Sequence, residues 1–163
     1  MAYQDMREWL SAVELDGELK RISGVDWNLE MSSISEIIYR HGKRPVPALL
    51  FDDIAGYPKG YRALFGLLSS PRRIARALYL PLPDQPIAPL ALVRSWGSKA
   101  KALKLIPPQF VATGPVRENS FSGDEVDLIK FPSPRCHELD GGRYIGTGHA
   151  VITRDPETGW VNL

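Results

Sequence analysis

The first two-thirds of the chain alternates between stretches with an apolar residue every three or four positions and short, continuous apolar runs. The first pattern predicts amphipathic helices, and the second predicts buried strands. We expect helices over residues 4–15, 32–41, a segment opening at Ser70-Pro71, and about 90–104. We expect strands over residues 18–22, 48–51 and 61–67. This alternation favours an α/β or α+β fold.

The helical periodicity also predicts which side chains face the core. The expected inward residues are Met6, Trp9, Leu10 and Val13 in the first helix and Ile34, Ile37 and Ile38 in the second. Ser33 and Glu36 stand three positions apart, which is the spacing of a capping box at a helix start.

The pattern changes after residue 80. Four prolines between 81 and 89 predict a surface linker, and Pro107-Pro108 ends the helix that follows. We place a domain boundary near 107–116. Beyond it the pattern predicts strands over residues 110–113, 126–131, 143–154 and from 159 onward. Residues 155–159 are expected to form the turn that joins the last two of these strands.

Composition narrows the class of protein. The 163 residues are 44% hydrophobic and 24% charged, with a net charge of +1, so neither nucleic acid nor membrane is indicated as a partner. Cys136 is the single cysteine, which excludes an internal disulfide and fits a reducing compartment. The sequence starts without a basic region followed by an apolar run, and no apolar stretch approaches the roughly 20 residues of a membrane span. We therefore expect a cytoplasmic protein.

Residues 70–104 carry an excess of basic side chains. Seven Lys and Arg residues face one acid, Asp84, in this stretch. They could form a phosphate or nucleic-acid surface, but solvated helix faces are the favoured interpretation, because lysines near a helix C-terminus suit its dipole.

Residues 143–154 place two glycines, Gly146 and Gly148, on one face of an expected strand. A bare patch of backbone is typical of close approach by a ligand or another backbone, and equally of a bulge or barrel corner. Nearby lie residue types that bind metals, namely Cys136, His137, Glu138, Asp140 and His149. Their spacing matches no structural zinc pattern, and a Cys136–His137 nucleophile pair is disfavoured because neighbouring strand side chains diverge.

Short motifs run in order through residues 114–162. They are GPV at 114–116, EN at 118–119, GDEVDL at 123–128, KFP at 130–132, Pro134, HELDGGRYI at 137–145, TG at 147–148, IT at 152–153, DP at 155–156 and Asn162. This series resembles the UbiD family of decarboxylases, which use prenylated FMN to remove or add carboxylate on unsaturated and aromatic acids. Weaker likeness extends through residues 5–10, 17–22, 47–54, 56–58 and 70–77. Cys136 stands where many relatives have tryptophan.

The resemblance implies a fold and a domain division. Residues 1–115 would form the N-terminal α/β domain. Residues 116–163 would begin the split β-barrel, of flavin-reductase-like type, that binds the cofactor, and the barrel would be truncated at Leu163. The family's C-terminal α/β domain, which helps form oligomers, would have no counterpart here, although the complete protein is expected to be a homo-oligomer.

The resemblance also implies site residues. Asn162 matches an asparagine that binds Mn²⁺ or Mg²⁺, and this ion holds the phosphate of prenylated FMN. An amide oxygen is a hard donor suited to such a cation. Leu163 matches a position whose backbone carbonyl helps bind K⁺. The arginine, histidine, glutamate and acidic proton donor that complete the family's site have no counterpart. No catalytic residue is therefore assigned, and we expect the chain alone to bind no cofactor and to be inactive.

The implied function is that of the N-terminal portion of a carboxy-lyase that reversibly decarboxylates an aromatic or α,β-unsaturated acid. The form HELDGGRYIGTG looks closest to relatives acting on hydroxylated aromatic acids. A UbiX-like flavin prenyltransferase would supply the cofactor. The alternative is a short non-catalytic subunit or fragment that docks on a partner carrying the rest of the active site. The substrate and the direction of reaction are not readable from the sequence.

Overall fold

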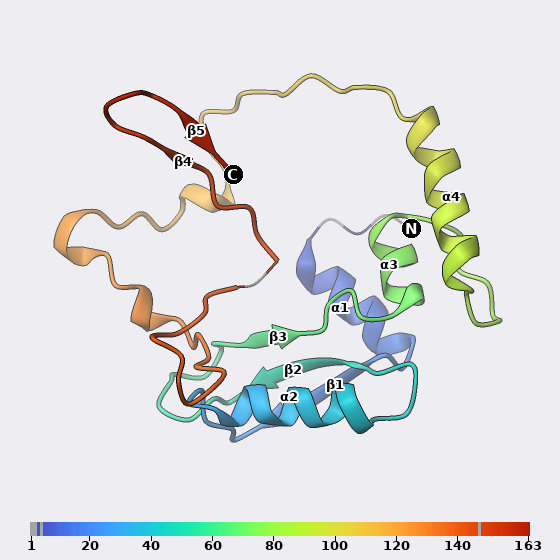
Figure 1. Ribbon diagram of the computed structural model, residues 1–163, viewed down its shortest axis with the longest axis horizontal. Coiled ribbons are helices and arrows are strands. Elements are labelled where there is room, and N and C mark those ends of the chain that lie inside the picture. Colours follow the sequence, from blue (N-terminus) through green and yellow to red (C-terminus); the bar gives the residue numbers. More distant parts are fainter. Residues whose placement is uncertain (1–2, 4, 147) are drawn as a thin grey trace.

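The computed structural model describes residues 3, 5–146 and 148–163. Up to residue 80 the described chain forms a three-stranded sheet with helices on both faces (Figure 1). Strand β1 (Leu19–Ser23) pairs in parallel with β2 (Ala48–Asp52), and β2 pairs antiparallel with β3 (Ala63–Phe65). Helix α2 (Glu30–His41) connects the two parallel strands, since such a pair needs a crossover. The predicted α/β character of this part is confirmed.

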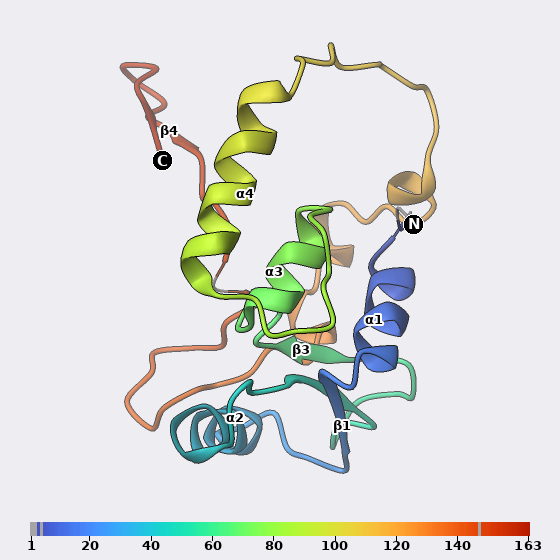
Figure 2. The same cartoon turned by 90° about the vertical axis from the view of Figure 1, so that its right-hand side faces the viewer.

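The core lies on both faces of β2, from which Ala48 to Phe51 are all buried. On one face, Leu49 and Phe51 pack with Met31 of α2. On the other side, helix α1 (Met6–Leu15) contributes Trp9, Leu10 and Val13, which contact Leu19, Leu64 and Leu67. Figure 2 shows α1 and α2 on opposite sides of the sheet.

The first two helices begin differently from each other. Asp5 caps α1, where its carboxylate accepts the amides of Arg7 at 2.8 Å and Glu8 at 2.9 Å. Residue 4, included in the expected helix, lies outside the described residues. The capping box predicted at Ser33 and Glu36 is wrong, because α2 starts earlier, at Glu30. There the Glu30 carboxylate accepts the Asp26 amide at 2.7 Å, which closes the turn leading into the helix.

Two residues expected to face the core are exposed. Ile37 has 61% of its surface exposed and Met6 has 51%. Helical periodicity predicts which face of a helix is apolar, but it does not predict how deeply each residue of that face is buried. The remaining inward predictions for α1, namely Trp9, Leu10 and Val13, are confirmed.

Helix α3 (Pro71–Ala77) begins where the sequence predicts, with the Ser70 hydroxyl accepting the Arg73 amide at 3.1 Å. Its arginines are not solvated as expected. Arg73 is 1% exposed and donates to Glu18 Oε2 at 2.9 Å, and Arg76 donates to Asp16 Oδ2 at 2.9 Å. Glu18 and Asp16 lie outside residues 70–104, so acids from earlier in the chain pair with the basic side chains of that stretch. The arginines therefore fasten α3 to the start of β1.

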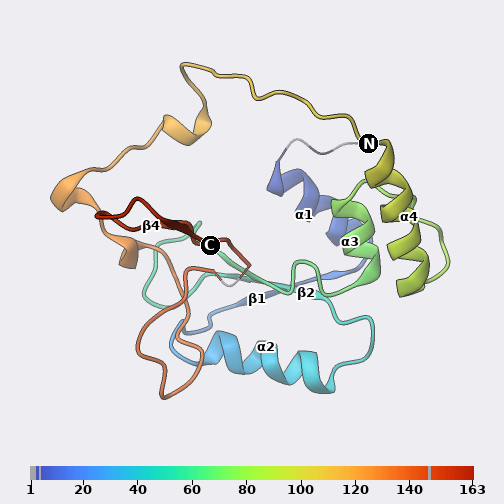
Figure 3. The same ribbon diagram turned by 45° about the horizontal axis from the view of Figure 1, so that its top comes forward.

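Helix α4 (Pro89–Ala102) stands apart from the sheet, and none of its residues is buried. Lys99 bonds the carbonyls of Leu78 at 2.6 Å and Tyr79 at 3.0 Å, so it too is paired rather than free. From residue 103 the chain arches away from the α/β unit (Figure 3). No helix in the described part of the chain is long and apolar enough to cross a membrane.

The second part of the chain, from residue 103 onward, is mostly irregular among the described residues. Its elements are the 3-10 turns η1 (Pro115–Arg117), η2 (Gly123–Glu125) and η3 (Leu128–Lys130), and the strands β4 (Thr153–Arg154) and β5 (Val161–Asn162). The strands predicted over 110–113 and 126–131 are wrong, and the strand predicted over 143–154 is reduced to its last two residues. A strand needs a hydrogen-bonded neighbour, and the described residues from 103 onward have one only between β4 and β5 and at a single bridge, that of Arg135 with Asn28.

Candidate cofactor and metal site

The β4–β5 hairpin carries the residues that the sequence assigns to a metal and a cofactor. Its turn is built around Asp155, whose carboxylate accepts the Thr158 amide at 2.7 Å and the Glu157 amide at 2.9 Å. Gly159 completes the turn with φ +72°, a conformation that suits glycine. The Thr158 amide, followed by the Thr158 hydroxyl and the Glu157 amide, holds the pKa of Asp155 below its ordinary value. The predicted turn at 155–159 is thus confirmed.

Asn162 lies in β5 directly opposite Thr153 of β4. Its side chain is exposed, and Leu163, the next residue, has 83% of its surface exposed. The hairpin therefore presents one amide and, one residue later, one backbone carbonyl to the outside of the described structure. This placement is compatible with the roles that the family resemblance implies, but no contact in the structure assigns them.

The described residues do not by themselves fit a divalent cation. Nowhere do three or more His, Cys, Asp or Glu side chains come together among them in a way that could hold a metal. Mg²⁺ and Mn²⁺ sites use carboxylate, carbonyl and water oxygens around an octahedron. The neutral amide of Asn162 could fill one position of such a site, and the other protein ligands would have to come from elsewhere.

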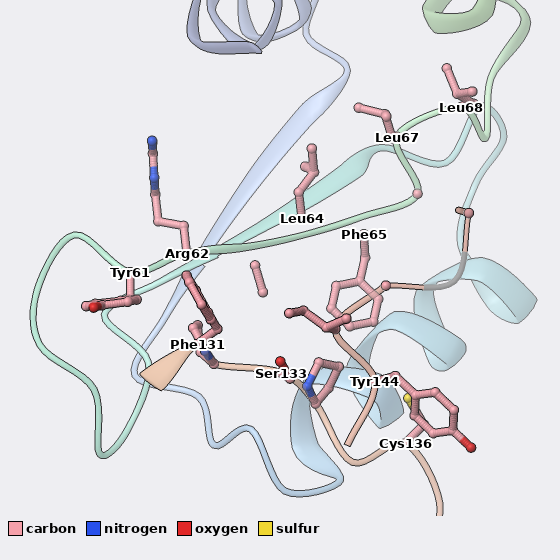
Figure 4. Close-up of a pocket in the computed structure, with 17 residues that line it drawn as sticks. Tyr61, Arg62, Leu64, Phe65, Leu67, Leu68, Phe131, Ser133, Cys136 and Tyr144 are labelled. Atoms are coloured by element: carbon pink, nitrogen blue, oxygen red, sulfur yellow. The ribbon is translucent and has the colours of Figure 1, made fainter. Parts of the chain in front are cut away.

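The structure also places a cavity of about 660 Å³ between β3 and the segment that follows η3 (Figure 4). Leu64, Leu67 and Leu68 lie along its sheet side, while Phe131 and Tyr144 come from the second part of the chain. Its wall is mainly apolar, as ligand pockets usually are. Asn162 does not line this cavity.

The bare glycine patch contributes to the cavity wall, since Gly146 and Gly148 both line it. A Cβ on Gly146 would stand 3.2 Å from the His149 ring, whereas Gly148 has open space around it. Thr147, between them, lies outside the described residues. The group nearest Gly146 is thus the side chain of a residue three positions on, neither a ligand nor another backbone, and the strand predicted around both glycines is absent, so both interpretations stay predictions.

The metal-type residues near Cys136 make local contacts instead. The Asp140 carboxylate accepts the amides of His137 at 2.8 Å and Cys136 at 3.1 Å. The His137 amide, more than that of Cys136, lowers the pKa of Asp140. Asp140 therefore closes the turn at 136–140, and the cysteine thiol and the histidine ring are not brought together as nucleophile and base by any contact in the structure.

Sequence reasoning missed two sets of contacts. Arg73 is buried among backbone carbonyls, and Arg143 lies over the ring of Trp27 with a hydrogen bond to Tyr57. The Glu18 carboxylate is 55 residues from Arg73, and Tyr57 is 86 residues from Arg143. Charge patterns within one element contain no signal for such pairs.

Two domain families match the chain. The 3-octaprenyl-4-hydroxybenzoate carboxy-lyase N-terminal domain matches residues 10–87, and the Rift-related domain of the same carboxy-lyase matches residues 109–163. A pyrrole-2-carboxylic acid decarboxylase of Pseudomonas aeruginosa is 34% identical to 96% of this chain. The chain covers 32% of that relative.

Solved structures agree. Vanillic acid decarboxylase of Sedimentibacter hydroxybenzoicus in its closed form superimposes with a TM-score of 0.77 at 26% identity, over 96% of this chain and 32% of the other. An evolved dimeric form of the UbiD-class enzyme HmfF from Pelotomaculum thermopropionicum, in complex with prFMN, gives a TM-score of 0.68 at 26% identity, over 98% of this chain and 34% of the other. The chain thus spans about a third of the length of these relatives.

Proposed function

Because the chain belongs to the UbiD family of carboxy-lyases, we propose that it forms the N-terminal part of a decarboxylase that uses prenylated FMN. The observation that carries this proposal is the order of the two matched domains, residues 10–87 followed by residues 109–163. The relatives are decarboxylases. The substrate would be an aromatic or α,β-unsaturated carboxylic acid, and the reaction would be reversible.

In this proposal the two parts of the chain have different tasks. Residues 1–115 form the α/β domain, and residues 116–163 form the first strands of a split, flavin-reductase-like barrel. Asn162 supplies an amide oxygen to the Mn²⁺ or Mg²⁺ that holds the cofactor phosphate, and the Leu163 carbonyl contributes to a K⁺ site. The exposure of both residues supports this assignment, because ligands from the rest of the barrel need access to them. A UbiX-like flavin prenyltransferase would supply the cofactor, and the whole enzyme would be a homo-oligomer.

The second candidate function is a short non-catalytic subunit that docks on a separate polypeptide carrying the rest of the site. One observation favours a missing surface of some kind. Large apolar side chains of the second part are exposed, among them Leu105, Ile106, Phe110, Val116 and Leu139. Such surface normally contacts another part of a protein. Whether the reading frame continues past Leu163 with barrel sequence distinguishes the two candidates.

Reconstitution tests the proposal. The chain is produced with a flavin prenyltransferase, both alone and together with the remaining two-thirds of a UbiD-class enzyme, fused in frame or as a separate polypeptide. Hydroxylated aromatic acids and pyrrole-2-carboxylic acid are then assayed for CO₂ release. We expect release only when the chain is completed, and loss of flavin retention in Asn162→Ala but not in the exposed-residue control Arg94→Ala. Release by the chain alone, or none from any completed form, would contradict the proposal.

A further inference from the structure

The second part of the chain touches the α/β unit in one limited stretch. Between residues 103 and 163, nearly every described residue is exposed. Apart from Gly114, the described residues that are covered are Pro132, Ser133, Pro134, Arg135, Cys136, Asp140 and Arg143. The position of everything that follows, including the glycine patch and the β4–β5 hairpin, therefore depends on how firmly this stretch is attached.

Backbone hydrogen bonds make the first attachment. The Leu29 amide donates to the Arg135 carbonyl at 2.9 Å, and the Arg135 amide donates to the Trp27 carbonyl at 3.1 Å. Together they form a parallel bridge between Asn28 and Arg135. Two bonds in a single bridge, without a continuing ladder on either side, hold a segment weakly, because sheet pairing gains stability from neighbouring pairs.

The Arg143 side chain makes the second attachment. Its Cζ lies 3.3 Å from the centre of the Trp27 ring, a cation–π contact. Its Nη1 donates to the Tyr57 hydroxyl at 2.6 Å, and that hydroxyl donates to the Ile129 carbonyl at 3.1 Å. One guanidinium thus connects the loop before α2 with the loop between β2 and β3 and, through the Tyr57 hydroxyl, with η3.

The two aromatic residues that Arg143 contacts are anchored against the hydrophobic core. Trp27 and Tyr57 both pack against the core cluster around Leu49 and Phe51. On the other side, the Tyr144 amide donates to the Pro134 carbonyl at 2.9 Å, which closes residues 134–144 into a loop with Arg143 at its exit. A planar guanidinium can stack and donate at the same time, whereas an ammonium group acts as a point charge.

We propose that Arg143 is a positioning residue, which fixes the glycine patch and the chain leading to Asn162 against the α/β unit by clamping onto Trp27 and Tyr57. The consequence for flavin binding rests on the function proposed above; the attachment itself does not. Arg143 would not contact the reacting atoms. Its role would be to fix the position from which the chain continues through the glycine patch to Asn162.

Hydrogen exchange on the whole chain tests the attachment directly. Loss of a cation–π contact and a hydrogen bond should raise amide exchange in residues 129–146 by about tenfold in Arg143→Ala. Arg143→Lys should restore part of the protection, since a lysine can still lie over Trp27. Tyr57→Phe should loosen the same residues, and Arg94→Ala should loosen none. Exchange in β1 and β2 should stay at the wild-type rate in all four variants.

Two outcomes overturn the proposal. One is wild-type protection of residues 129–146 in Arg143→Ala. The other is equal acceleration in β2, which would make Arg143 a general stabilising residue and not a local clamp. Tyr57→Phe keeps the test decisive if Arg143→Ala does not fold, because it removes only the hydroxyl between Arg143 and Ile129.

A second measurement extends the test to the completed enzyme, with FMN as the probe. Arg143→Ala should weaken FMN binding severalfold while leaving the thermal midpoint of the α/β unit unchanged, and Arg143→Lys should recover part of it. If the completed wild-type protein binds no flavin, the proposed function fails, while the exchange experiment still decides the role of Arg143. If it binds flavin and Arg143→Ala binds equally well, the positioning role fails alone.

Discussion

The α/β unit up to residue 80 and the region from residue 103 onward both contain large apolar side chains but pack them in opposite ways. The buried hydrophobic side chains of the described core all lie between Trp9 and Leu80. In the later region, Leu105, Phe110 and Leu139 are almost fully exposed. A sheet with helices on both faces buries its own apolar stripes. In the later region, no surface formed by the described residues covers these apolar side chains.

The comparison extends to charged groups. In the α/β unit, Arg73 and Glu18 form an ion pair in which the arginine is 1% exposed and the Glu18 side chain 12%. Burial lowers the pKa of Arg73, while Glu18 acts in the opposite direction and favours the charged form. In the later region, Asp140 and Asp155 bond backbone amides of their own turns. Glu18 therefore joins two distant segments of the first region, whereas Asp140 and Asp155 each shape a local turn in the second.

Arg73→Met gives the largest expected effect. It leaves the Glu18 carboxylate without its cation and removes the Arg73 donor from the carbonyls of Val46 and Gly66, of which Gly66 still accepts the Ser69 amide. Breaking a buried pair by removing one partner costs about 3–5 kcal/mol. Urea unfolding followed by far-UV circular dichroism measures the loss, and Arg94→Ala on α4 is the matched control with an exposed arginine. A loss below about 1 kcal/mol would show that the α/β unit does not depend on this pair.

Gly66→Ala tests how tightly the same unit is packed. Gly66 has φ +66°, and an added Cβ would collide with the Tyr39 hydroxyl. A non-glycine residue in this conformation costs about 1–3 kcal/mol before any collision. Gly56→Ala is the matched control, since Gly56 has φ +80° but nothing within 4 Å. We expect Gly66→Ala to lower the urea midpoint more than Gly56→Ala, with partial recovery on adding Tyr39→Phe. Equal midpoints would mean that the space around Gly66 is not restricted.

Tyr39 gives a pH-dependent version of the same test. Its hydroxyl is buried without a hydrogen-bond partner, and burial raises the pKa of Tyr39 to about 12. The unfolded chain, with the ordinary pKa of 10.0, loses this proton first as pH rises. Stability is therefore unaffected below about pH 10 and falls between about pH 10 and 12. Unfolding midpoints at several values of pH should show this fall in the wild type and a smaller one in Tyr39→Phe; parallel curves would rule out the assignment.

The two regions also differ in how far sequence predicts them. Strand β2 and helix α1 were expected within one or two residues, because the apolar pattern that forms them is local and their partners lie in the same unit. The cap at Ser70 was equally local. The role of Arg73 could not be predicted, since its carboxylate partner is 55 residues away. The apolar pattern of a segment therefore predicts a helix or a strand, but it does not predict which distant charged residue that element contacts.

In the later region the predicted strands at 110–113 and 126–131 were wrong for a related reason. A period of two shows that a segment could pair, but whether a neighbouring strand is present is a property of the tertiary structure. The turn at Asp155 was predicted correctly, because its hydrogen bonds span only three residues. The assignments of Asn162 and Leu163 came from family resemblance and stay predictions.

Asp155→Ala gives the smallest expected effect and tests the comparison from the other side. The variant removes the two bonds from the Glu157 and Thr158 amides, so the β4–β5 hairpin should open and its amides should exchange faster. Because the hairpin residues are exposed, the unfolding midpoint of the α/β unit should not change. Glu157→Ala keeps both bonds and is the control.

The lowered pKa of Asp155 adds a pH dependence to the stability of the hairpin. The contribution of Asp155 is present above the ordinary pKa of 3.8 and is lost as pH falls through the folded-state pKa. Wild-type hairpin exchange should then approach that of the variant in acid, at equal intrinsic rates. If Asp155→Ala instead lowered the midpoint of the α/β unit, the two regions would be energetically coupled, and the attachment at Arg143 would carry more than the position of one segment.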